Sequence, residues 1–199
     1  MRVRTVIGIV VLGLLLVAPR TASAQARSGG WVGFGGGVGS AGGTCDDCES
    51  DDRETGGVGY VNAGVTVSPN LLLGAEFNLW TKKYVDPDFG GEAQVNFYNL
   101  LGTATIYPSS GGFFLKGGAG VAFSDIDIKD SGLSITFDMG RGLALIGGAG
   151  IDLPVGRVVL TPAVNYWFGS TGDLKYEGEA LLSGMKHNVL AFTVGVKWP

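Results

Sequence analysis

Large apolar residues alternate with small or polar residues along most of the chain, and the pattern is most regular near its end. From Asn188 to Trp198, every second residue is large and apolar: Leu190, Phe192, Val194, Val196 and Trp198. The residues between them are Val189, Ala191, Thr193, Gly195 and Lys197. Because successive side chains of a strand point to opposite faces, this pattern predicts a strand with one fully apolar face.

The same alternation predicts eight antiparallel strands and no amphipathic helix. The strands are expected at Gly30–Ser40, Val58–Ser68, Leu71–Thr81, Val95–Tyr107, Phe113–Ser124, Leu143–Leu153, Val158–Gly169 and Asn188–Trp198. Three connections are short, at 68–70, 108–112 and 154–157, and four are long and polar, at 41–57, 82–94, 125–142 and 170–187. Short turns that alternate with long loops are typical of closed barrels in outer membranes, with the long loops outside the cell.

The second face of each strand indicates which side of such a barrel meets lipid. In the third strand this face carries Leu72, Gly74, Glu76, Asn78 and Trp80, and in the fifth it carries Phe114, Lys116, Gly118, Gly120, Ala122 and Ser124. A soluble ligand-binding barrel would turn these faces outward and expose glycine and alanine with hardly a charge. We therefore predict an all-β, eight-stranded antiparallel transmembrane up-and-down β-barrel whose apolar face contacts lipid.

The start of the chain predicts export. Arg2 and Arg4 precede an apolar run at 5–18, and the small residues Ala22, Ser23 and Ala24 follow. This order is typical of a signal peptide, here residues 1–24 with cleavage before Gln25, which leaves 25–199 as the barrel domain. The apolar run is shorter than the roughly 20 residues that a membrane-spanning helix needs.

Composition supports a membrane barrel and excludes nucleic acid as a partner. The chain has 45% hydrophobic residues, 16% charged residues and 36 glycines. Inside a narrow barrel, glycine leaves room for bulkier neighbours. Cleavage removes three of the 14 basic residues, so 11 remain against 18 acidic residues, a formal charge of −7. Such a surface repels nucleic acid.

Aromatic residues are expected at the two membrane interfaces. Those near the inner end are Tyr107, Phe113 and Trp198, and those near the outer end are Trp80, Tyr84, Tyr98, Phe123, Tyr166 and Phe168. In the fourth strand, Phe97 and Leu101 point inward if Tyr98, Leu100 and Ile106 face lipid, which leaves a break in register there open.

Four charged residues are predicted to point into the lumen near the periplasmic end. They are Glu76, Lys116, Asp152 and Lys197. Because an unpaired buried charge is costly, we expect these residues to pair and plug the lumen, with Lys116 as the partner of Glu76. A narrow channel that opens when the pairs rearrange, or a passage for small hydrophobic molecules, remains an alternative.

The first long loop holds the only cysteines, Cys45 and Cys48, within an acidic run. A disulfide is favoured over a redox motif or half of a metal site, because the exported chain meets an oxidising environment and offers too few zinc ligands. The acidic residues are Asp46, Asp47, Glu49, Asp51, Asp52 and Glu54. They lack the spacing of a calcium loop, so weak cation binding is the alternative to a solvated loop. No metal or cofactor is predicted.

The strand-turn-strand from Gly147 to Phe168, together with the glycine-rich strand Phe113 to Phe123, resembles the small outer-membrane β-barrel proteins of the OmpA, OmpX and OmpW type. This resemblance implies a Gram-negative outer membrane and contact with its lipid and lipopolysaccharide. It also implies insertion by the barrel-assembly machinery through the terminal residues Thr193, Gly195 and Trp198. The chain departs from the pattern at Pro199, where an aromatic residue is expected.

Some barrels of this kind modify lipid A with a histidine and a serine, so an enzyme is the remaining class. The only histidine is His187, and Ser183 and Glu179 are near it in sequence without the spacing of the deacylase pattern. We therefore expect a monomeric, non-enzymatic barrel with a structural or surface-interaction role that resides in acidic extracellular loops.

Overall fold

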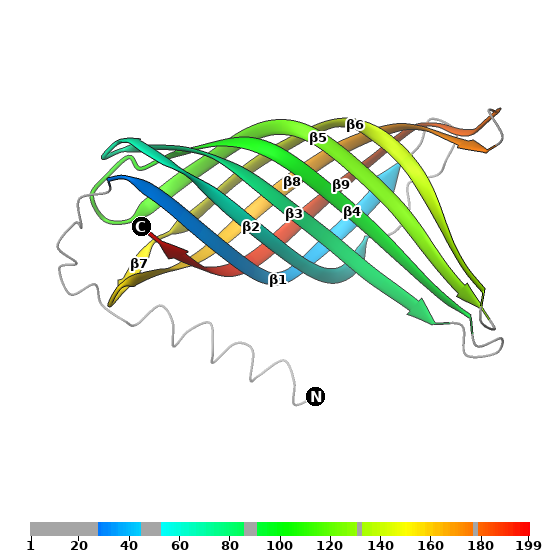
Figure 1. The fold of residues 1–199 in the computed structure, drawn as a ribbon, viewed down its shortest axis with the longest axis horizontal. Helices are drawn as coiled ribbons and strands as arrows, with labels where there is room; N and C mark the ends of the chain where they lie inside the picture. Colours follow the sequence, from blue (N-terminus) through cyan, green and yellow to red (C-terminus); the bar gives the residue numbers. More distant parts are fainter. Residues whose placement is uncertain (1–27, 45–52, 86–90, 131–132, 177–178) are drawn as a thin grey trace.

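The computed structural model describes residues 28–44, 53–85, 91–130, 133–176 and 179–199. Its strands form one antiparallel sheet that closes on itself (Figure 1). They are β1 (Gly30–Thr44), β2 (Glu54–Ser68), β3 (Leu71–Val85), β4 (Glu92–Ile106), β5 (Phe113–Asp130), β6 (Leu133–Ile151), β7 (Leu153–Val155), β8 (Val158–Tyr176) and β9 (Glu179–Trp198). None of the described segments is a helix long and apolar enough to cross a membrane.

The pairing of β1 with β9 and that of β6 with β8 close the sheet. Each strand from β1 to β6 pairs with its neighbour in sequence, β9 pairs with both β1 and β8, and β6 pairs with β8. The short β7 also pairs with β8 and is separated from β6 only by Asp152, so β6 and β7 occupy one position in the barrel. The prediction of an eight-stranded antiparallel barrel is confirmed.

The interruption between β6 and β7 includes the position where Ile151 lies opposite Pro162. The β6–β8 ladder ends at the pair Gly150–Ala163 and resumes in β7 at Leu153–Leu160, so Pro162 falls in the gap. Proline has no backbone N–H to donate across a ladder. On the other side of the strand, the backbone N–H of Asp152 donates to the carbonyl oxygen of Gly112, which precedes β5, at 2.9 Å. The Asp152 side chain, next to this gap, is buried.

The two faces of the strands are as the alternation predicts. In β9, Phe192 and Val194 are 56% and 54% exposed on the outside, whereas Ala191 and Thr193 are 0% and 3% exposed on the inside. In β4, Leu101 is buried in the barrel while Leu100 is exposed. The β3–β4 register runs without a shift from Leu71–Ile106 to Val85–Glu92, so the break in register considered for this strand does not occur.

The strands are longer than predicted, and three of the four predicted long loops, at 82–94, 125–142 and 170–187, are for the most part paired strand. In the fourth, 41–57, the ends are strand and residues 45–52 lie outside the described residues. Backbone pairing continues to Val85–Glu92 in β3 and β4, to Asp130–Leu133 in β5 and β6, and to Tyr176–Glu179 in β8 and β9. These β-ribbons extend from the barrel at the end away from the C-terminus (Figure 1). Polar composition marks where the strands leave the apolar band, but antiparallel pairing itself needs only backbone groups and tolerates polar side chains.

Two of the predicted interface aromatics lie inside the barrel instead. Trp80 is 1% exposed and Tyr107 is 0% exposed. Trp198, Phe113 and Tyr166 are exposed on the outside, as an interface position requires. Trp80 lies four residues after the inward-facing Glu76 on the same strand, so the alternation places it on the inward face. Its nearness to the outer end of the strand therefore did not predict which face it occupies.

Candidate functional site

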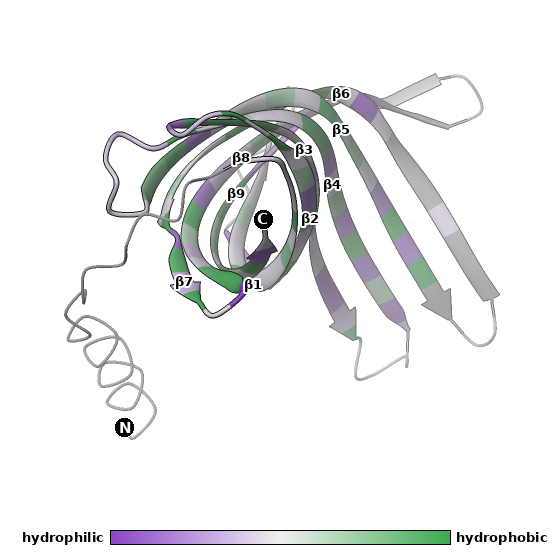
Figure 2. Ribbon diagram, turned by 60° about the vertical axis from the view of Figure 1, so that its left-hand side comes forward, coloured by the Kyte–Doolittle hydropathy of each residue, from purple (hydrophilic) through white to green (hydrophobic). Residues whose placement is uncertain are grey.

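The barrel lumen, which is the candidate site, is filled by side chains at successive levels along the barrel axis. The level nearest the termini holds a mouth cluster of four buried residues, Trp31, Leu72, Tyr107 and Phe114. Seen toward this end, the strands curve around the lumen (Figure 2).

One ion pair lies beside the mouth cluster. The Lys197 ammonium is 2.8 Å from the Asp152 carboxylate. The hydroxyls of Tyr107 and Thr161 donate to the same carboxylate at 2.6 Å and 2.9 Å, and Lys197 also donates to the Tyr107 hydroxyl at 3.1 Å. Several charge-assisted hydrogen bonds thus compensate the burial of Asp152.

Aromatic rings surround the ammonium of Lys197. Its Nζ atom lies 5.7 Å from the ring centroids of Trp31 and Phe114 and 5.9 Å from that of Tyr107. A cation over a ring face is attracted by the ring's quadrupole. The mouth cluster therefore attracts the Lys197 ammonium through cation–π contacts from three rings.

A second ion pair forms the centre of a polar layer made of Tyr60, Asn62, Glu76, Asn78, Asn99 and Lys116. The Lys116 ammonium is 2.8 Å from the Glu76 carboxylate, and these side chains are 10% and 1% exposed. Asn62 and Asn78 each donate to Glu76 at 3.2 Å, and Asn99 donates to Asn78 at 2.8 Å. Lys116 also lies 5.6 Å from the ring centroid of Tyr60.

The structure thus brings the four predicted lumen charges together as two pairs. The neutral partners of these charges were missed by the sequence analysis, among them Asn62, Tyr107 and Thr161. The available indication was strand parity, since a polar residue on the inward face of a narrow barrel must bond to another inward residue.

Further from the termini the lumen becomes apolar. We call this level the apolar layer, whose buried residues are Ala41, Val58, Trp80, Leu101, Ala122, Ala144, Ile146, Trp167, Val189 and Ala191. The indole N–H of Trp80 donates to the Gly39 carbonyl at 2.9 Å, which holds that ring in place.

Three rings stack across this part of the lumen. The centroids of Trp80 and Phe97 are 5.2 Å apart, and those of Phe97 and His187 are 4.2 Å apart with an interplanar angle of 3°. These rings come from β3, β4 and β9, so the stack spans strands that are not all neighbours in the sheet. It obstructs the route from the polar layer to the outer end.

His187 is a packing residue in this stack rather than part of a visible catalytic pair. It is 3% exposed, and its Nε2 atom has no hydrogen-bond partner among the described residues. Glu179 and Ser183, the other members of the enzyme alternative, lie in β9, and the structure describes their backbone but not their side chains. No nucleophile is bonded to His187 in the part of the chain that the structure describes.

Glycines make room for the larger lumen side chains. A Cβ atom on Gly195 would lie 1.9 Å from the Tyr60 hydroxyl oxygen, and one on Gly35 would lie 2.6 Å from the Tyr60 ring. A Cβ on Gly169 would lie 2.3 Å from the His187 ring. The high glycine content therefore has the steric explanation that the sequence suggested.

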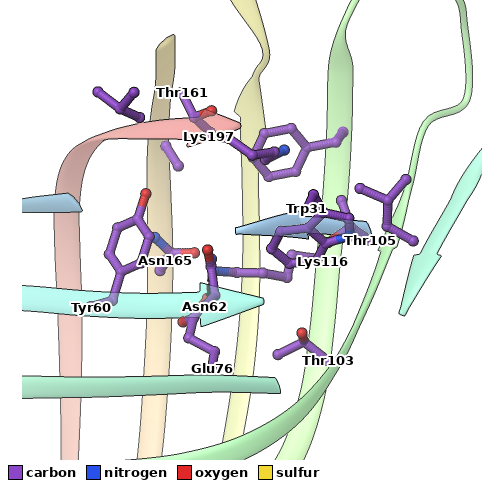
Figure 3. A pocket seen from close by; sticks show the side chains of 14 residues that line it. Trp31, Tyr60, Asn62, Glu76, Thr103, Thr105, Lys116, Thr161, Asn165 and Lys197 are labelled. Carbon is purple, nitrogen blue, oxygen red and sulfur yellow. Dashed lines mark hydrogen bonds and ion pairs between the residues drawn. The ribbon is translucent and has the colours of Figure 1, made fainter. Parts of the chain in front are cut away.

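Between the described side chains of the polar layer, little space is left. A cavity of about 30 Å³ lies in the polar layer and reaches the mouth cluster, with Glu76, Lys116, Lys197, Trp31 and Asn165 among its lining residues (Figure 3). This volume is enough for one or two water molecules.

The structure describes only some of the remaining predicted site residues. Cys45, Cys48, Asp46, Asp47, Glu49, Asp51 and Asp52 fall outside the described residues. Glu54 begins β2 and lies 3.3 Å from Lys82. In β9, Thr193 and Gly195 face the lumen and Trp198 faces outward. No group of three or more metal-ligating side chains occurs within the described segments.

Comparisons of the fold identify a class. The structure resembles Ail, the attachment invasion locus protein of Yersinia pestis, with a TM-score of 0.59 and 12% identity, over 85% of this chain and 99% of that one. It also resembles Neisserial surface protein A, with a TM-score of 0.56 and 12% identity, over 87% of this chain and 99% of that one. No family model and no curated protein sequence matches the chain.

The fold is that of the small outer-membrane β-barrels. Its lumen is distinguished by two ion pairs beneath an apolar layer.

Proposed function

We propose that the protein is a non-enzymatic barrel of the Gram-negative outer membrane, exported by its signal peptide, with a lumen plugged by side chains. The observation that carries this proposal is the filling of the lumen, where two ion pairs and the apolar layer leave a cavity of about 30 Å³. A general diffusion pore needs a continuous aqueous channel.

The outer surface supports the membrane location. Valines, leucines and phenylalanines face outward from the strands at roughly half exposure, for example Phe34 at 53%, Val61 at 55% and Leu143 at 53%. In water such a band would be a large aggregation surface, whereas in a bilayer it meets hydrocarbon.

Fractionation and conductance test this function together. We expect the mature protein in the outer-membrane fraction, with a mobility shift on boiling and β-structure that forms only with detergent or lipid. In planar bilayers it should give no stepwise conductance, beside an open porin as positive control. Folding in plain buffer would contradict the membrane location, and a reproducible single-channel step would contradict the plug.

We further propose that the β-ribbons and their tips carry the surface interactions. The similar protein Ail was solved with a heparin analogue, sucrose octasulfate. The expected mature charge of −7 argues against a polyanionic partner for this chain, so its partner at the cell surface should be cationic or bridged by divalent ions. Cells displaying the barrel should bind polylysine-coated beads more than heparin-coated beads, and the reverse preference would refute the assignment.

Lipid and lipopolysaccharide are the proposed partners along the barrel wall. Arg141 is exposed beside the Phe123 ring, with its Cζ atom 6.0 Å from the ring centroid. A guanidinium at an aromatic interface level is suited to lipid phosphate. The barrel-assembly machinery is the proposed partner during insertion, and the mature barrel is proposed to be a monomer.

A further inference from the structure

The imidazole of His187 lies at the edge of the apolar layer, two residues beyond Val189 on the inward face of β9. Its ring centroid is 4.2 Å from that of Phe97 with an interplanar angle of 3°, and Phe97 stacks in turn on Trp80. The His187 side chain is 3% exposed, and its Nε2 atom has no hydrogen-bond partner among the described residues. The stack therefore uses the imidazole as a flat ring and not as a hydrogen-bonding group.

The backbone of β8 packs against the edge of the same ring. Gly169 is the cross-strand partner of His187, and a Cβ atom on this glycine would collide with the Cε1 and Nε2 atoms of the imidazole. The same Cβ would lie 3.0 Å from the Cβ atom of Ala122. The close neighbours of Nε2 on this side are thus aliphatic carbons, which accept no hydrogen bond.

The charged groups on the surrounding strands do not offer the ring a negative partner. The Lys82 ammonium, two residues beyond Trp80 on the same face of β3, lies 3.3 Å from Glu54. Lys186 precedes His187 and is on the opposite face of β9 by alternation. The other described charges near this level are engaged elsewhere: Glu92 with Lys83, Asp125 with Asn96, Asp127 with Thr136, Arg53 with Ser40 and Asn188, and Arg141 with the Phe123 ring. Among the described residues, a proton on His187 would meet no free carboxylate.

Protonation changes what the imidazole requires. The neutral ring has one N–H donor and one acceptor nitrogen, whereas the imidazolium has two N–H donors and a full positive charge. A cation over the Phe97 ring gains some attraction from the ring's quadrupole. Burial of a charge without a hydrogen-bonded counter-ion costs more than one ring contact returns. The stacked position therefore suits the neutral imidazole, and the imidazolium is more stable where water reaches it.

We propose that His187 makes the closure of the outer lumen sensitive to acid. Protonation of its imidazole displaces the ring from Phe97 toward the outer opening, so that the apolar layer around Trp80 becomes exposed to water. Return to neutral pH restores the stack. The proposal rests on the plugged lumen, because a barrel that is already open has no closure to release.

This response depends on a single residue. His187 is the only histidine of the chain, and histidine is the side chain that ordinarily gains its charge between about pH 5 and 8. The two ion pairs, Lys116–Glu76 and Lys197–Asp152, lie nearer the termini and are not part of the stack. They continue to fill the lumen when the stack opens, so acidification should expose the apolar layer without producing a conducting pore.

Nuclear magnetic resonance of the intact barrel in lipid nanodiscs tests the proposal as the pH is lowered from about 7.5 to about 4.5. The single histidine gives one set of imidazole signals, whose shifts report both the proton and the ring current of Phe97. Exchange of the Trp80 indole proton with water reports exposure of the apolar layer, because this proton is bonded to the Gly39 carbonyl in the closed barrel. We expect loss of the Phe97 ring current and a roughly tenfold or greater fall in the Trp80 protection factor at one common midpoint.

His187→Phe is the matched variant, because it keeps an aromatic ring in the stack and removes the titrating nitrogens. Its Trp80 indole should stay protected over the whole pH range. Backbone amides of the β1–β9 ladder near the termini are the internal control and should stay protected in both proteins. An unchanged Trp80 protection factor in the unmodified barrel, or an equal fall in His187→Phe, would overturn the proposal.

The unmodified barrel decides the question even if His187→Phe does not fold. Opening caused by a carboxylate would follow a midpoint different from that of the imidazole signals, so a Trp80 midpoint that departs from the His187 midpoint would also refute the proposal. Failure of the plug is measured separately. An open lumen would give bilayer conductance at neutral pH, whereas a closed lumen that ignores acid would give no conductance and a protected Trp80 throughout.

Discussion

Removing the Glu76 carboxylate should destabilise the barrel more than removing both members of its ion pair. Glu76 is 1% exposed and accepts hydrogen bonds from Lys116, Asn62 and Asn78. Glu76→Ala leaves the Lys116 ammonium, itself 10% exposed, with no carboxylate against it. Breaking a buried pair in this way costs about 3–5 kcal/mol.

The double variant Glu76→Ala/Lys116→Ala removes the stranded charge. It still leaves a cavity and two unsatisfied amides, so it should remain less stable than the unmodified barrel. Its loss should nevertheless be smaller than that of Glu76→Ala alone. The coupling energy of the cycle should be about 1–3 kcal/mol.

Urea unfolding in lipid vesicles measures these values. Tryptophan fluorescence reports the transition because Trp31, Trp80 and Trp167 are buried in the lumen, and electrophoretic mobility provides a second probe. The exposed pair Lys83–Glu92, whose side chains are 51% and 39% exposed, is the matched control and should couple by no more than about 1 kcal/mol. Additive losses at Glu76 and Lys116 would refute the pairing.

Three further predictions concern the wall, the glycines and the outer end. Val194→Arg should lower the free energy of unfolding by about 2–4 kcal/mol, because it places a charge in lipid. Ala191→Arg should prevent folding, because the lumen at Ala191 is filled. Equal tolerance of both variants in a refolding assay would show that the two faces of β9 are assigned wrongly. Gly195→Ala should cost about 1–3 kcal/mol because the added Cβ meets Tyr60, while Gly117→Ala, with no atom within 4 Å, should be nearly neutral in the same urea titration. Cys45 and Cys48 should resist alkylation until a reductant is added, as mass spectrometry of the purified protein can establish; alkylation without reductant would exclude the disulfide.

Strand parity made the fold and much of the lumen predictable, because a two-residue period assigns every side chain to a face once one face is known. It placed Glu76, Lys116, Asp152 and Lys197 inside. The expected pairing of Lys116 with Glu76 occurs in the structure. The neutral partners of these charges were not predictable, since they depend on the stagger between strands around the closed barrel.

Two further features depended on information that no local pattern holds. The ends of the strands were missed because a ribbon outside the membrane has no apolar face to mark it, as Asp127 and Thr136 illustrate by hydrogen bonding to each other across β5 and β6 at 2.6 Å. Tyr107 follows the last residue of β4, and only the fold reveals that its hydroxyl reaches Asp152.

The paired ribbons at the end of the barrel away from the C-terminus limit how a protease or an antibody can bind there. Beyond the aromatic level at Phe123, residues Asp125–Asp130 are still in register with β6, and six extended residues span about 20 Å. A protease needs a single extended strand in its cleft, so a hydrogen-bonded ribbon resists cutting until it is locally opened. Antibodies raised against the folded barrel will accordingly recognise side chains from two strands at once, and boiling will abolish that recognition together with the fold.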